Sequence, residues 1–197
     1  MPLWKSSVSS FILWLVLSTA SFAAKLDPQF ANETLVLNAG LAQAKRYMDT
    51  DRCQKAVQQE IPELAGAEKL FLKEAFESKM RIVPVPYIAD GSRIKGVTNC
   101  DLDPLAIVIS TVNAMWEPDE VPQTIIHEYV HAISCKKILR DWGTQTRLFI
   151  TAAGEMDDPQ AKAAREYITE LEYSAYRAGA RCVGEPIPEF AKRKEAE

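Results

Sequence analysis

The chain has 197 residues, of which 47% are hydrophobic and 25% are charged. This composition is typical of one globular domain with enough apolar side chains for a core, and it excludes disordered, fibrous and repetitive proteins. The formal net charge of −4 gives no indication of nucleic-acid binding.

Residues 1–23 have the features of a secretory signal peptide. Lys5 precedes an apolar run at 11–17, and small residues lead to a cleavage point after Ala23. The run is too short for an ordinary membrane span, and an uncleaved anchor is the alternative. Cleavage removes one of 23 basic residues and none of 27 acidic ones, leaving 22 against 27 and a balance of −5. We therefore expect an exported protein, periplasmic or secreted, with no stable membrane span after cleavage.

Two helices are predicted near the start of the mature chain. Residues 32–57 show helical spacing, although Gly40 weakens that prediction. The apolar residues at this spacing are Leu37, Leu41, Ala44 and Met48. A second helix is predicted over 68–79, after a break marked by Pro62 and Gly66.

Two extended segments follow. Residues 81–88 contain two prolines, which restrict them to an edge strand or an irregular segment. Residues 105–112 form the best predicted strand, because a continuous apolar run lies between Asp103-Pro104 and Asn113. We expect this strand to lead directly into the next helix.

The C-terminal half is predicted to be mainly helical. A helix is expected over 120–140, ending before Gly143, and another over 159–182. Residues 144–156 fit either a short strand or a helix, and the charged tail at 189–197 is expected to be loose. The sequence therefore predicts an α+β fold that is mostly helical.

Four cysteines lie in the exported part, which predicts two disulfides in an oxidising compartment. Sequence leaves three pairings open. We favour Cys135 with Cys182 and Cys53 with Cys100, because the first pair would join the ends of the two C-terminal helices.

The helix at 120–140 carries the pattern H-E-x-x-H in His127-Glu128-Tyr129-Val130-His131, with the only two histidines of the chain. Residues i and i+4 share one helix face, so both imidazoles can bind one metal ion. Glu128 lies beside that face, where it can act as the general base toward a metal-bound water. The pattern predicts one catalytic Zn²⁺.

The alternative is that the two histidines are hydrogen-bonded core residues. Their helix is apolar on nearly all sides, through Ile125, Ile126, Val130, Ile133, Ile138 and Leu139. Two imidazoles and a carboxylate are costly in such surroundings unless something compensates them. A metal ion does so, and this favours the zinc site.

A catalytic zinc needs a third protein ligand. The arrangement H-E-x-x-H-x-x-G-x-x-H requires glycine and histidine where this chain has Ser134 and Lys137. A Cys135 thiolate lies about 12 Å along the helix from His127, too far for one ion to reach both easily. The remaining candidates are glutamates of the last helix, namely Glu166, Glu170 and Glu172.

Helical periodicity separates these three glutamates. Glu172 shares its face with Ala161, Ile168, Ala175, Tyr176 and Gly179, whose small members permit close approach of another helix. Glu166 and Glu170 lie toward the opposite side with Arg177 and Arg181, where we expect a solvated face. The alternative for Glu172 is a partly buried carboxylate paired with Arg165.

These residues resemble the motifs of a known protein family. His127 to His131, followed by Glu172-Tyr173-Ser174-Ala175, resemble the H-E-x-x-H and downstream E-x-x-A signature of gluzincin zinc metallopeptidases. The resemblance covers well under half of the chain. The branch with E-x-x-A-D has an aspartate where this chain has Tyr176.

The resemblance implies His127, His131 and Glu172 as metal ligands and Glu128 as the base. It also implies a small zincin-like domain, which we place at 24–188, with a short sheet packed on the H-E-x-x-H helix and a C-terminal helix that bears the glutamate.

The resulting hypothesis is an exported zinc metallopeptidase that hydrolyses peptide bonds of a protein or peptide substrate. Tyr176, one turn beyond Glu172, is the candidate oxyanion donor, and a core tyrosine is its alternative. The strand at 105–112 would offer an edge to an extended peptide. Two other functions stay open: a non-catalytic zinc-binding envelope or interaction protein, and a metal-free helical binding module stapled by disulfides.

Overall fold

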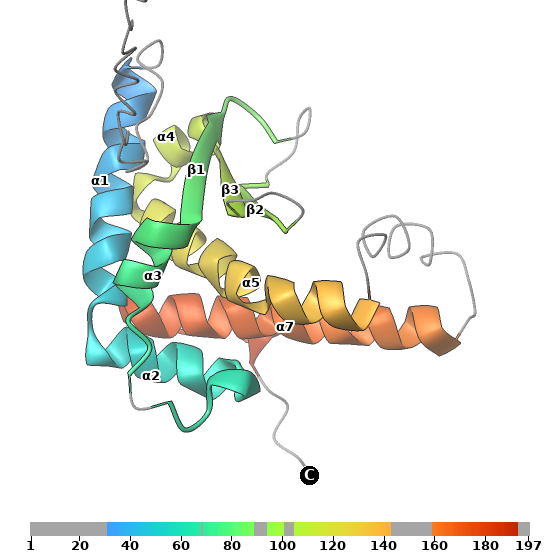
Figure 1. Cartoon of the computed structure of the whole chain (residues 1–197). Helices are drawn as coiled ribbons and strands as arrows, with labels where there is room; N and C mark the ends of the chain where they lie inside the picture. The colour runs from blue at the N-terminus through green and yellow to red at the C-terminus, as the bar shows by residue number, and fades with distance from the viewer. Residues whose placement is uncertain (1–30, 68, 89–93, 101–104, 143–158, 193–197) are drawn as a thin grey trace, which may run out of the picture.

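The structure is a computed structural model that describes residues 31–67, 69–88, 94–100, 105–142 and 159–192 (Figure 1). The predicted signal peptide, the ambiguous segment 144–156 and residues 193–197 of the predicted tail lie outside these ranges. Within them the fold is α+β and mostly helical, as predicted. None of the described helices combines the length and the apolar character that crossing a membrane requires.

The predicted N-terminal helix is two helices, α1 (Ala31–Met48) and α2 (Asp51–Glu60). The break lies at Thr50, whose extended backbone and side-chain oxygen cap α2 by accepting a hydrogen bond from the amide of Cys53. The four predicted apolar positions of α1 are all in the core. Gly40 fits there because a Cβ atom would lie 2.3 Å from Cγ1 of Val121, so the glycine permits a close helix crossing.

The second predicted helix is shorter than expected. A 3₁₀ turn, η2 (Pro62–Leu64), follows α2, and α3 spans Leu72–Lys79. Phe71 precedes α3 with φ 48°, a left-handed conformation that cannot continue a helix backwards along the chain. The helix therefore begins four residues later than predicted.

Among the described residues, three strands form one sheet in the order β1-β3-β2. Strand β1 (Met80–Val85) pairs parallel with β3 (Leu105–Ser110), and β2 (Gly96–Asn99) pairs antiparallel with it. The proline-containing β1 is an edge strand, as predicted. Strand β3 is central, so the expectation that a peptide lies along its edge is wrong: both of its sides are already paired.

The chain does not pass directly from β3 into the H-E-x-x-H helix, contrary to our expectation. Helix α4 (Thr111–Trp116) and the 3₁₀ turn η3 (Pro118–Glu120) come between them. Ser110 begins α4, because its side-chain oxygen accepts a hydrogen bond from the amide of Asn113.

The two long helices, α5 (Val121–Trp142) and α7 (Pro159–Val183), lie side by side and run in opposite directions (Figure 1). Gly179 permits this approach, because a Cβ atom there would lie 3.3 Å from Cγ of Gln123 in α5. Helix α5 also contacts α1, β2 and β3, so it is covered on several sides. This position explains why it is apolar nearly all round.

The two disulfides are present, but the favoured pairing is wrong. Cys53 pairs with Cys182, and Cys100 pairs with Cys135. The packing explains the first pair, because α2 lies against α7 and places Cys53 beside the C-terminal end of α7. Cys100 immediately follows β2, which packs on α5 beside Cys135.

The predicted loose tail is ordered in its first part. The turn η5 (Glu189–Ala191) packs on α7, and Ala191 is fully buried. The domain therefore extends beyond residue 188.

Candidate metal centre

His127, His131 and Glu172 converge where α5 and α7 pack together. Nε2 of His127 lies 3.1 Å from Nε2 of His131, because the two residues are one turn apart on the same face. The Glu172 carboxylate reaches across from α7, with Oε1 3.3 Å from Nε2 of His127 and Oε2 3.0 Å from Nε2 of His131. Three side chains of metal-ligating type thus meet at one point, and within the described part of the chain these residues form the one such group.

The spacing of these atoms fits a zinc ion. Zinc is bound tetrahedrally with bonds of about 2.0–2.1 Å to nitrogen and about 2.0–2.2 Å to oxygen, which places ligand atoms about 3.3 Å apart. The two imidazole nitrogens, 3.1 Å apart, lie close to this value. Each histidine meets a different oxygen of Glu172, at 3.3 and 3.0 Å, and one ligand atom from each of the three residues lies within 4.8 Å of the others. Three protein ligands leave the fourth position open, which is the arrangement of catalytic zinc sites.

The site also holds two carboxylates, those of Glu128 and Glu172. Glu128 is only 6% exposed and lies beside the ligands, with Oε1 4.0 Å from Nε2 of His127. Among the described residues, no lysine or arginine pairs with Glu128 or Glu172. Burial alone would raise the pKa of Glu172, but its hydrogen bonds and ion pairs with the two histidines outweigh burial and hold this pKa well below its usual range. A divalent ion would offset both carboxylates.

The Glu128 carboxylate is held by strand β2. Oγ1 of Thr98 lies 2.8 Å from Oε2 of Glu128 and 2.6 Å from its backbone oxygen, so the hydroxyl donates to Glu128. Gly96 leaves room on the same strand, because a Cβ atom there would lie 2.7 Å from Cγ of Glu128. These contacts leave Oε1 facing the histidines and fix the orientation of the carboxylate.

The ring of His127 is positioned by other rings. It makes edge contacts with His131, at 4.8 Å between centroids, and with Tyr176, at 4.4 Å. Its Nδ1 atom is buried and has no hydrogen-bond partner among the described residues. Metal-binding histidines usually have a partner at this nitrogen. Here the ring contacts, together with the contacts of Nε2 with Glu172 and His131, orient the ring.

Tyr176 lies beside the candidate metal ligands. Burial raises the pKa of its phenol, and the nearby Glu172 carboxylate raises it further. The phenol is therefore protonated at neutral pH. Its ring also meets Phe190 edge-on, with centroids 4.9 Å apart.

An open cleft of about 640 Å³ reaches the site. Three parts of the chain line it, namely the start of β2, the first half of α5, and α7 with the segment that follows it. The candidate residues among its lining are His127, Glu128, Glu172 and Tyr176. The cleft is large enough for part of a peptide.

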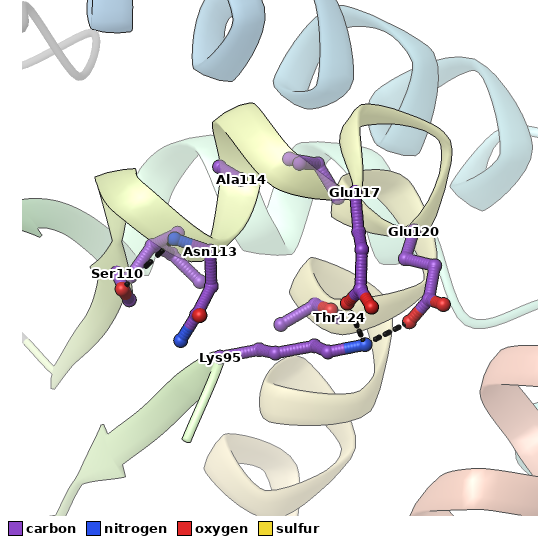
Figure 2. Close-up of a pocket in the computed structure, with 9 residues that line it drawn as sticks. Lys95, Ser110, Asn113, Ala114, Glu117, Glu120 and Thr124 are labelled. Carbon is purple, nitrogen blue, oxygen red and sulfur yellow. Dashed lines mark hydrogen bonds and ion pairs between the residues drawn. The ribbon is translucent and has the colours of Figure 1, made fainter. Parts of the chain in front are cut away.

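Lys95 connects two walls of this cleft. Lys95 immediately precedes β2. Figure 2 shows its side chain extending to the carboxylates of Glu117 and Glu120, which precede α5. Hydrogen bonds and charge attraction from these carboxylates outweigh burial and raise the pKa of Lys95. The ion pairs fix the start of β2 against the start of α5.

The structure therefore brings the five predicted residues, His127, Glu128, His131, Glu172 and Tyr176, around one point. Glu166 and Glu170 are exposed, as expected, whereas Arg177 is only 2% exposed and does not belong to a solvated face. Sequence reasoning missed Gly96 and Thr98, because β2 has only four residues and too short a pattern to predict. The β-branched pair Val97-Thr98 was the available signal.

Comparison of the chain with protein-family models, with curated proteins and with solved structures finds no match.

Proposed function

We propose that this protein is an exported zinc metallopeptidase of zincin-like architecture. The observation that carries the proposal is the convergence of His127, His131 and Glu172, whose ligand atoms lie within 4.8 Å of one another, beside a buried glutamate that is not one of the three. The two disulfides support export, because such bonds persist in oxidising compartments.

In this mechanism His127, His131 and Glu172 hold the ion. Zinc, when bound, supplies a Lewis acid and lowers the pKa of its water ligand. Glu128 accepts the proton of the attacking water at its carboxylate and later donates it to the nitrogen of the leaving amine. Thr98 keeps that carboxylate oriented through its hydrogen bond to Oε2.

Tyr176 acts on the oxygen of the scissile carbonyl. Its protonated phenol lines the cleft between the ligands and the C-terminal segment. A hydrogen bond donated to the developing oxyanion is stronger in the transition state than in the ground state, and therefore accelerates the reaction.

Strand β2 lies at the cleft: it pairs with β3, and Gly96 at its start is one of the lining residues. An extended peptide bound in the cleft would therefore lie beside the start of β2 and the candidate catalytic groups.

The test compares Glu128→Gln with the wild-type chain and with Glu166→Gln, which changes an exposed carboxylate of α7 outside the cleft. The protein is purified with its disulfides formed and incubated with an unfolded protein mixture, and new peptide termini are counted by mass spectrometry. We expect Glu128→Gln to keep its zinc and lose at least about 100-fold in cleavage rate, while Glu166→Gln cleaves normally. Equal activity of all three proteins would instead support a non-catalytic zinc protein.

A further inference from the structure

The C-terminal segment turns back toward the candidate metal centre after α7. Gly184 adopts φ 88°, and the amides of Gly184 and Glu185 both donate to the carbonyl of Ala180, each at 2.9 Å. A left-handed glycine at this place is a common helix C-terminus and reverses the chain. The segment 185–191 therefore returns along α7 and does not leave the domain.

Arg177 fastens the far end of this segment. Its Nη1 donates to the carbonyl of Ala191 at 3.0 Å, and its Nε donates to Glu60 of α2 at 2.8 Å. Its Nη2 donates to Glu170 at 2.7 Å. A buried guanidinium with several charge-assisted partners holds its neighbours in a defined geometry. Arg177 thus fixes the segment against both α7 and α2.

The segment places Phe190 in the cleft. This side chain is 58% exposed although the next residue, Ala191, is fully buried. Its ring packs edge-on against Tyr176, which in turn packs against His127. An exposed phenylalanine two ring contacts from a metal ligand has no role in the core, and an exposed apolar surface beside a reaction centre indicates recognition.

The chemistry of the lining indicates what this wall would bind. Pro186, Pro188 and Phe190 form an apolar wall, and Ile94, 44% exposed, also lines the cleft. The charged groups of the lining away from the metal centre are Lys95, Glu120 and Glu185. The lysine is already paired with Glu117 and Glu120, so the remaining charge is negative.

We infer that Phe190, held in place through the Arg177–Ala191 contact, forms a subsite for an apolar substrate side chain next to the cleaved bond. This inference rests on the proposed function and names its substrate class: peptides with a large apolar residue near the scissile bond and without acidic neighbours. Burial of such a side chain against Phe190 favours the apolar peptide, and the acidic lining repels carboxylates.

The experiment measures binding and does not depend on turnover. Two chelators are titrated into the zinc-loaded protein by calorimetry: acetohydroxamate, and a hydroxamate that carries a phenylethyl group. We expect the aromatic compound to bind about 10-fold or more tightly in the wild type. Phe190→Ala should remove most of this gain, and Phe190→Leu should retain most of it. Phe71→Ala is the matched control, because Phe71 is 52% exposed and does not line the cleft.

Two results would overturn the inference: no preference for the aromatic hydroxamate in the wild type, or the same preference in Phe190→Ala. Unchanged zinc content and melting temperature in Phe190→Leu guard against a folding effect. If the aromatic hydroxamate binds more tightly because of Phe190 but the protein cleaves no peptides, the subsite stands and the proposed hydrolase function is refuted. If the protein cleaves peptides but the tighter binding does not depend on Phe190, the hydrolase function stands and the subsite is refuted.

Discussion

Oε2 of Glu172 lies 3.0 Å from Nε2 of His131, and this contact joins α7 to α5. The carboxylate reaches both histidines although its side chain is 43% exposed. A carboxylate and two imidazoles in this arrangement are the kind of ligand set that binds a divalent cation, and the proposed zinc site rests on it.

Replacing Glu172 tests its role as a ligand. Glu172→Gln keeps the shape of the side chain and removes its negative charge, so we expect zinc affinity to fall by more than the roughly 10–100-fold that loss of an outer-shell partner costs. Competition with a fluorescent zinc chelator measures this affinity. Glu166→Gln, an exposed glutamate of the same helix, is the control and should bind zinc as the wild type does.

Thr98 is predicted to be a positioning residue for Glu128. Thr98→Val removes the hydrogen bond to Oε2 with little change in volume, and we expect kcat to fall about 10-fold, corresponding to about 1.4 kcal/mol, with zinc still bound. Thr98→Ser restores the hydroxyl and should recover most of the rate. If valine and serine variants were equally active, the hydroxyl would have no part in catalysis.

Gly96 gives an independent test of the same contact. In Gly96→Ala the new methyl would lie 2.7 Å from Cγ and 3.0 Å from Oε1 of Glu128, so the carboxylate must move. We expect peptidase activity to be lost while the zinc content stays at the wild-type level. Gly66→Ala is the comparison, because Gly66 has φ 84° and open space around it. That variant should lose about 1 kcal/mol of stability and keep its activity, and the opposite pattern would refute the account.

The disulfides should differ in their effects on activity. The Cys53–Cys182 bond spans 129 residues and Cys100–Cys135 spans 35, for which loop entropy predicts losses of about 5 and about 4 kcal/mol on removal. The Cys100–Cys135 bond joins the end of β2 to α5. The double variant Cys100→Ala, Cys135→Ala should therefore lose activity even at temperatures at which the variant is folded. Denaturant melts and peptide-cleavage rates measure the two effects, and peptide mapping without reductant checks the pairing.

The sequence was sufficient to predict which side of α7 carries the site. Helical periodicity places Glu172 on a different face of the helix from Glu166 and Glu170. The i, i+4 spacing of His127 and His131 places both histidines on one face of their helix. These features depend only on residue spacing within one helix, so the sequence alone is enough to predict them. The mostly helical α+β class followed from the same periodicity.

Long-range packing decided the features that were predicted wrongly. Helical periodicity places Arg177 on the same side as Glu166 and Glu170, where glutamates are usually exposed. In the structure α2 and η5 cover Arg177 and supply its partners. The pairing of Cys53 with Cys182 depends on how α2 meets α7, which no local pattern encodes. Strand β2 exists because it pairs with β3, and its own four residues carry little signal.

The most direct measurement is a crystal structure of the mature protein with anomalous diffraction recorded on both sides of the zinc absorption edge. The account predicts one zinc peak about 2.0–2.2 Å from Nε2 of His127, Nε2 of His131 and a carboxylate oxygen of Glu172, with a water at the fourth position near Glu128. A zinc-supplemented crystal with no peak between these three side chains, or with the metal bound elsewhere, would contradict it.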